Sequence, residues 1–138
     1  MHKTLSRAFA AMIIGVCFVP SALAGQMASP EGLWELWYRD SRYQLSLCQG
    51  DRLCGTLVWL SPGSSQDPEK VKYLNTPIFN AAKRVGDRTW SGEINLLGIR
   101  AQGRVTQVSD DKMELRGCTL GVLCQTFHLD RIEEPASN

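Results

Sequence analysis

The sequence has few of the side chains that carry out catalysis or bind metals. Of its two histidines, only His128 lies outside the N-terminal segment described below, so no histidine pair is left to share a metal. The chain also lacks a Gly-x-Ser-x-Gly elbow and a glycine-rich phosphate loop. A lone histidine in a strand is more often a surface residue than a catalyst. We therefore expect no enzyme activity, no metal and no cofactor.

Clustered positive charge is also absent. The 15 lysines and arginines nearly balance the 14 acidic residues, and the longest basic run is Lys83 followed by Arg84. Nucleic-acid binding draws its affinity from clustered basic side chains around phosphates. This composition argues against a nucleic-acid partner.

No apolar run is long enough to span a membrane. The longest, residues 8–19, has about twelve residues, whereas a spanning helix needs roughly 20. It follows a basic start with Lys3 and Arg7 and precedes the small-residue sequence Ala22-Leu23-Ala24. These are the three parts of a secretory signal. We predict that residues 1–24 are a cleaved signal peptide, that the mature chain has no membrane span, and that it is periplasmic or secreted.

Four of the five cysteines lie outside this segment, in two pairs of equal spacing: Cys48 with Cys54, and Cys118 with Cys124. An even number in an exported chain predicts disulfides, and three connectivities are possible. Each pair brackets a turn signal, Gly50-Asp51 or Gly121. A three-residue hairpin loop would place the two cysteines opposite each other, within bridging distance. We favour this local pairing over a redox-active pair, because the Cys-x-x-Cys motif is missing, and over a zinc site, because an oxidising compartment disfavours four free thiolates.

Short segments with strand character, separated by turn residues, recur along the rest of the chain. They predict eight strands, at 33–39, 42–48, 53–60, 78–84, 89–96, 99–108, 112–118 and 123–131. The exception is 61–77, which we expect to be a lid or a mobile surface loop, with one helical turn from Pro68 to Tyr73. Residues 25–132 would form one all-β domain, and 133–138 a disordered tail. An eight-stranded antiparallel barrel fits this pattern best, with a β-sandwich as the alternative.

From Pro30 to Arg131 the chain resembles a family of small bacterial exported proteins of unknown function with a lipocalin-like fold. The motifs that carry this resemblance are Gly32-Leu33-Trp34, the segment 48–60 with Leu53-Cys54-Gly55, Asp67-Pro68, Trp90-Ser91-Gly92, Leu115-Arg116-Gly117-Cys118 and Leu129-Asp130-Arg131. The resemblance implies a barrel in which Trp34, beside Gly32, packs at the closed end beneath Arg131. It also implies a periplasmic location, and it supplies no activity. The chain departs from the family pattern after Gly92, so the next hairpin is expected to differ.

Aromatic side chains are the better candidates for ligand or partner contacts. Alternation places Trp34, Leu36 and Tyr38 on one face of the first strand and leaves Trp37 on the other, partly exposed. The same argument places Trp59 on the face of Leu57. Trp37, Trp59 and Tyr73 are thus the predicted contact residues.

The leading functional hypothesis is a non-catalytic periplasmic module that binds a small apolar ligand or an envelope component. The alternative is a protein interaction module, such as an inhibitor or an envelope assembly factor.

Overall fold

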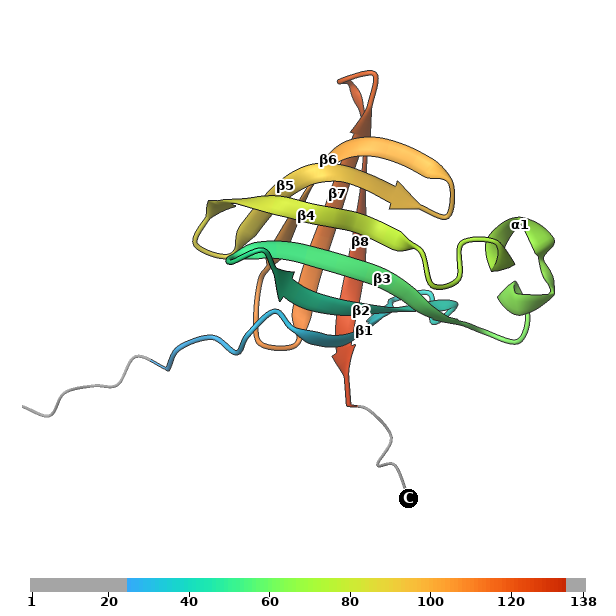
Figure 1. The fold of residues 1–138 in the computed structure, drawn as a ribbon, viewed down its shortest axis with the longest axis horizontal. Coiled ribbons are helices and arrows are strands. Elements are labelled where there is room, and N and C mark those ends of the chain that lie inside the picture. Colours follow the sequence, from blue (N-terminus) through green and yellow to red (C-terminus); the bar gives the residue numbers. More distant parts are fainter. Residues whose placement is uncertain (1–24, 134–138) are drawn as a thin grey trace, which may run out of the picture.

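The computed structural model describes residues 25–133, and these form an eight-stranded antiparallel barrel (Figure 1). The strands are β1 (Gly32–Leu36), β2 (Ser41–Cys48), β3 (Arg52–Leu60), β4 (Pro77–Gly86), β5 (Thr89–Leu96), β6 (Ile99–Gln107), β7 (Lys112–Thr119) and β8 (Leu123–Ile132). The predicted signal peptide and residues 134–138 of the predicted tail lie outside the described residues.

Pairing between the first and last strands closes the barrel. Each strand pairs with its neighbour in sequence, and β1 also pairs with β8, from Leu33 opposite Ile132 to Leu36 opposite Leu129. This closure leaves no open edge along β1 and decides against the β-sandwich. The eight strands follow the predicted segments closely, because polar and glycine-containing turns interrupt the alternating pattern at nearly every strand end.

The connections divide between two ends of the barrel. At one end, here called the floor, lie the β2–β3, β4–β5 and β6–β7 turns and the segment that precedes β1. At the other, here called the mouth, lie the β1–β2, β3–β4, β5–β6 and β7–β8 connections. The interior contains the buried apolar residues, including Trp34, Tyr43, Leu45, Leu53, Leu57, Phe79, Trp90, Val105, Met113, Leu115 and Leu129.

Both predicted disulfides are formed, one at each end of the barrel. Cys48 bonds to Cys54 beside the floor, and Cys118 bonds to Cys124 beside the mouth. Cys118 lies directly opposite Cys124, as predicted, but Cys48 lies opposite Arg52, so the floor disulfide joins a diagonal pair. The position of glycine explains the difference, because each turn is built on a residue–glycine pair with positive φ: Gln49-Gly50 directly after Cys48, but Leu120-Gly121 one residue later after Cys118.

A bulge in β3 overturns the predicted face of Trp59. Arg42 pairs with Trp59 and Tyr43 with Leu57, so Val58 is the extra residue and the alternation shifts there. Leu57 points into the barrel and Trp59 points out, with the Arg42 guanidinium carbon 4.1 Å from its ring centroid.

Strand β1 is shorter than predicted and ends at Leu36. Tyr38 therefore lies in the β1–β2 turn, where it is 62% exposed, and not on the inner face with Trp34.

The long connection between β3 and β4 is folded and hydrogen bonded. It contains a 3₁₀ turn (Ser64–Gln66) and the predicted helical turn α1 (Pro68–Val71), which the Asp67 side chain caps by accepting from the Glu69 N–H. The Asn75 N–H donates to the Leu57 carbonyl over 2.7 Å, which ties its end to β3. Tyr73 packs against the core and against Gly98 of the β5–β6 turn. Figure 1 shows this connection to one side of the barrel.

Candidate ligand-binding site

The floor is closed around Trp34 and Arg131. Trp34 is fully buried, and its indole N–H donates to the Pro30 carbonyl over 2.9 Å. Arg131, its register partner on β8, places its guanidinium carbon 4.4 Å from the indole centroid. The same guanidinium donates to the carbonyls of Glu31 (2.6 Å) and Asp110 (2.7 Å). Gly32 is required here: its φ is +130°, and a Cβ would lie 2.9 Å from Arg131 Nη1.

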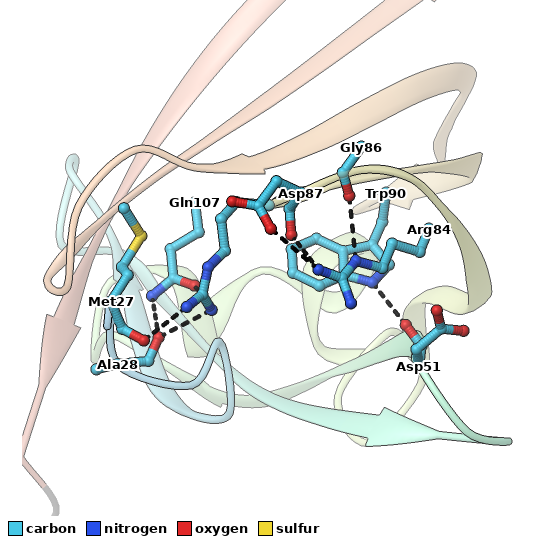
Figure 2. Close-up of polar contacts among 9 residues, drawn as sticks. Met27, Ala28, Asp51, Arg84, Gly86, Asp87, Trp90 and Gln107 are labelled. Atoms are coloured by element: carbon cyan, nitrogen blue, oxygen red, sulfur yellow. Dashed lines mark hydrogen bonds and ion pairs between the residues drawn. The ribbon is translucent and has the colours of Figure 1, made fainter. Parts of the chain in front are cut away.

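A short segment before β1 is bound across the floor (Figure 2). Arg88 donates to the carbonyls of Met27 (2.6 Å) and Ala28 (3.2 Å), and the buried Gln107 amide donates to the Ala28 carbonyl over 2.9 Å. The Ala28 N–H donates to the Asp110 carboxylate over 2.7 Å. These bonds hold Met27 and Ala28 across the floor.

The β2–β3 and β4–β5 turns complete this end. The Trp90 indole N–H donates to the Asp51 carbonyl over 2.8 Å, and Arg84 donates to the carbonyls of Gly86 and Asp87 (Figure 2). These bonds close the floor end of the barrel, and the apolar cavity lies at the opposite end.

An apolar cavity of about 470 Å³ lies at the mouth. Its wall is the inner surface of β5 to β8, with Ile94, Leu96, Ala101, Leu115, Thr119 and Phe127 among the lining residues. The lining includes no acidic or basic side chain. The volume falls within the range of small-molecule sites, roughly 300 to 1,000 Å³.

The cavity follows from unequal strand lengths and small inward residues. β1 reaches only to Leu129 of β8, so the first half of β8 extends past β1 and the mouth stays open there. Ala101 and Gly117 take up little space on the inner surface. At Gly103 the Ile94 side chain fills the space that a Cβ would occupy. The hollow thus lies above Ile94 and not throughout the barrel.

Exposed apolar side chains lie beside the cavity, at the ends of the β5–β6 and β7–β8 hairpins. Leu120 is 90% exposed and Val122 79% exposed, at the tip of the β7–β8 hairpin, and Leu123 and Ile99 are also exposed. We call these four residues the apolar rim. Figure 1 shows the β7–β8 hairpin projecting beyond the rest of the barrel.

A second, more polar hollow of about 780 Å³ lies between the long connection and strands β4 and β5. It is lined in part by Lys72, Tyr73, Phe79 and Glu93. Its mixed and charged lining suits an apolar ligand less well than the first cavity.

The structure does not bring the three predicted contact residues together. Tyr73 lines the polar hollow, Trp59 lies on the outer surface beneath Arg42, and Trp37 lies in the β1–β2 turn. None of them lines the apolar cavity. The residues that do line it were missed because an inward apolar residue at a strand end has the same sequence pattern as one in a filled core.

His128 lies on the outer surface, with Nδ1 3.8 Å from the Glu114 carboxylate. Within residues 25–133, no group of three or more histidine, cysteine or acidic side chains is arranged to hold a metal. Nor does this part of the chain contain a helix long and apolar enough to cross a membrane.

Burial perturbs one ionisable group in the barrel interior. Loss of solvent raises the pKa of Tyr43 to about 12, although its hydrogen bond to Ser41 acts in the opposite direction. The hydroxyl donates to Ser41 Oγ over 3.1 Å, so the phenol is held neutral on the inner face of β2.

The closed antiparallel barrel of eight strands, with a tryptophan on the first strand beneath an arginine of the last, defines a lipocalin-like β-barrel protein. Among solved structures, it is similar to protein HP1028 from the human pathogen Helicobacter pylori, which is described as belonging to the lipocalin family. The two share 18% sequence identity with a TM-score of 0.55, over 75% of this chain and 83% of that one. At this identity the likeness shows the fold. The chain matches no protein-family model and no curated protein.

Proposed function

We propose that the protein is a non-catalytic binding module that holds a small apolar ligand in the cavity at the mouth. The observation that carries this proposal is the uncharged, apolar lining of a cavity that opens opposite a closed floor. Eight-stranded barrels are wide enough to hold one small ligand. His128 lies outside the barrel wall and takes no part in this role.

The lining defines the class of ligand. Ile94, Leu96, Leu115 and Phe127 would contact an apolar body, and Gln125 and Thr119 offer hydrogen bonds nearer the tip of the hairpin. A charged group inside the cavity would lose its hydration and gain no counter-ion. The ligand expected is therefore an apolar chain or ring system with at most one uncharged polar group.

The two disulfides support an oxidising compartment as the place of action. Together with the predicted signal peptide, they favour a periplasmic or secreted protein. An apolar component of the cell envelope is then the ligand that such a module would meet.

Binding of N-phenyl-1-naphthylamine, an uncharged dye that fluoresces in apolar surroundings, tests the proposal. Ala101→Leu puts a larger side chain into the cavity and should weaken dye binding about tenfold or more, because it excludes the ligand from part of its site. Gln102→Leu is the matched control, since it adds a leucine on the outer surface of the same strand. Equal dye affinity of both variants and the parent protein would contradict the proposal.

A second candidate function is protein interaction through the β1–β2 turn. Trp37 is 56% exposed, and its ring lies 4.7 Å from that of Tyr38, which is also exposed. Aromatic residues of this kind are enriched at protein interfaces. A photo-crosslinker at Trp37 should then capture one specific protein in cells, and the same crosslinker at Lys83 should not. Capture of nothing specific at Trp37 would argue against this function.

A further inference from the structure

The two disulfide-bonded hairpins form a natural comparison, because they share one cysteine spacing and lie at opposite ends of the barrel. The loop of the floor hairpin is polar, Gln49-Gly50-Asp51, and that of the mouth hairpin is apolar, Leu120-Gly121-Val122. A solvent-exposed turn has no folding reason to be apolar. The difference therefore points to a function at the mouth.

The conformation of Leu120 strengthens this argument. Its φ is +54°, a left-handed conformation that bulky side chains rarely adopt and that asparagine adopts far more readily. The side chain gains nothing from the fold in return, because it is 90% exposed. The β5–β6 turn has the same backbone conformation at Leu97-Gly98, but Leu97 packs against the core, so only the Leu120 side chain lacks support from the fold. An unfavourable backbone conformation combined with an unpacked apolar side chain is better explained by a partner than by stability.

The surface beside the apolar rim is basic. Arg100, Arg104 and Arg116 are all exposed on β6 and β7, and residues 115–129, which include the whole β7–β8 tip, contain no acidic residue. The acidic residues at this end lie elsewhere, on the β1–β2 and β3–β4 connections and at Glu93 of β5. Arg104 and Arg116 are register partners on β6 and β7, an unfavourable pairing of like charges. Among the described residues no carboxylate lies within 4.0 Å of the three guanidinium groups. The positive charge beside the rim suits an anionic partner.

We propose that the apolar rim inserts into the interface of a lipid bilayer that contains anionic headgroups, with the three arginines facing those headgroups. Arg116 is three residues from Thr119, roughly 10 Å along an extended strand, which is within reach of the headgroup layer when the tip is inserted. Long basic side chains readily place their charge at that level. The proposal extends the proposed function, because the cavity would then open on the membrane and exchange its ligand there.

The shape of the rim favours a bilayer over a protein. It is a projecting tip (Figure 1), whereas a stable protein interface needs about 800 Å² of complementary surface on each partner. A second copy of the chain packed tip to tip would bring the arginines of both copies together. Insertion of two or three apolar side chains with basic neighbours is sufficient for reversible membrane binding.

Flotation with lipid vesicles tests the proposal. The disulfide-intact mature protein should float with vesicles of phosphatidylcholine and phosphatidylglycerol and bind pure phosphatidylcholine vesicles more weakly. Leu120→Asn should reduce binding about tenfold or more, because it removes one largely inserted leucine. Asparagine also suits the left-handed conformation, so the variant should fold at least as well as the parent. Val85→Thr, which changes an exposed valine on β4 close to the floor, is the matched control and should leave binding unchanged.

The triple variant R100Q/R104Q/R116Q tests the role of charge. It should lose the preference for phosphatidylglycerol and most of the salt dependence of binding, since each basic residue near an anionic surface contributes about a fivefold gain in affinity. Failure of the parent protein to float with anionic vesicles would overturn the proposal. The proposal would also be overturned if Leu120→Asn bound anionic vesicles as well as the parent protein does. A dimer in solution that this variant dissociates would overturn it too.

The dye measurement separates this proposal from the function on which it rests. Leu120 does not line the cavity, so Leu120→Asn should bind N-phenyl-1-naphthylamine normally in the absence of vesicles. If the protein bound vesicles but no dye, the proposed membrane-binding surface would stand and the proposed ligand cavity would be refuted. Dye binding without vesicle binding would refute only the membrane surface.

Discussion

The guanidinium of Arg131 lies over the indole of Trp34, 4.4 Å from its centroid, and main-chain carbonyls hold it in this position. Its N–H donors join the β6–β7 turn and the segment before β1 to the end of β8. The Arg131 side chain thus connects three separate parts of the floor. The Trp34 indole beneath it is fully buried and separates the guanidinium from the core.

Replacement of Trp34 by alanine should lower the free energy of unfolding by about 3 to 5 kcal/mol, because it leaves a large cavity under Arg131. Urea unfolding followed by circular dichroism measures the change. Trp37→Ala is the matched control, and it should change stability by about 0.5 kcal/mol or less, since its side chain is mostly exposed. Similar values for the two variants would refute the structural role of Trp34.

Gly55 on β3 should tolerate no side chain. A Cβ there would lie 2.7 Å from Phe79, 2.8 Å from Ile78 and 2.8 Å from Leu45, so Gly55→Ala should destabilise the barrel by about 1 to 3 kcal/mol through overpacking. Gly63→Ala is the control, because nothing lies within 4 Å of its Cβ position. If Gly55→Ala and Gly63→Ala unfolded at the same urea concentration, the prediction would be wrong. The side chains of β2 and β4 around Gly55 would then move apart at little cost.

Stability should fall at high pH because of Tyr43. Burial raises its pKa to about 12, whereas the unfolded chain releases this proton near pH 10. Between these values the unfolded state binds fewer protons than the folded state, so the free energy of unfolding decreases as the pH rises. The loss should reach about 2 to 3 kcal/mol by pH 12. Urea unfolding at pH 9 and pH 11 measures this loss. If the Tyr43→Phe protein lost the same stability between these pH values, Tyr43 would not be its cause.

Each disulfide closes a short loop and should contribute about 2 kcal/mol by restricting the unfolded chain. Removal of either pair, as Cys48→Ser with Cys54→Ser or as Cys118→Ser with Cys124→Ser, should leave a folded barrel of lower stability. Peptides from a non-reducing digest should contain only the 48–54 and 118–124 bonds. A bond between Cys48 and Cys118 would be incompatible with this fold, since they lie at opposite ends of the barrel.

The sequence predicted the strands well, because period-two alternation and glycine turns are local signals. The bulge at Val58 is not local: it depends on how β2 and β3 pair, and it turned Trp59 to the outer surface. The cavity was beyond prediction for a similar reason. The cavity exists because β1 does not extend along the first half of β8. The sequence of β8 gives no information on where β1 ends.

The bonds from Arg88 and Gln107 to Met27 and Ala28 have a practical consequence. They hold the segment before β1 at the floor. Strand β8 also ends at the floor, next to the start of β1. A tag, a dye or a surface linker attached to either end of the described chain would therefore leave the mouth free. The orientation of an immobilised molecule is thus determined by the fold, and both proposed binding surfaces would face the solution.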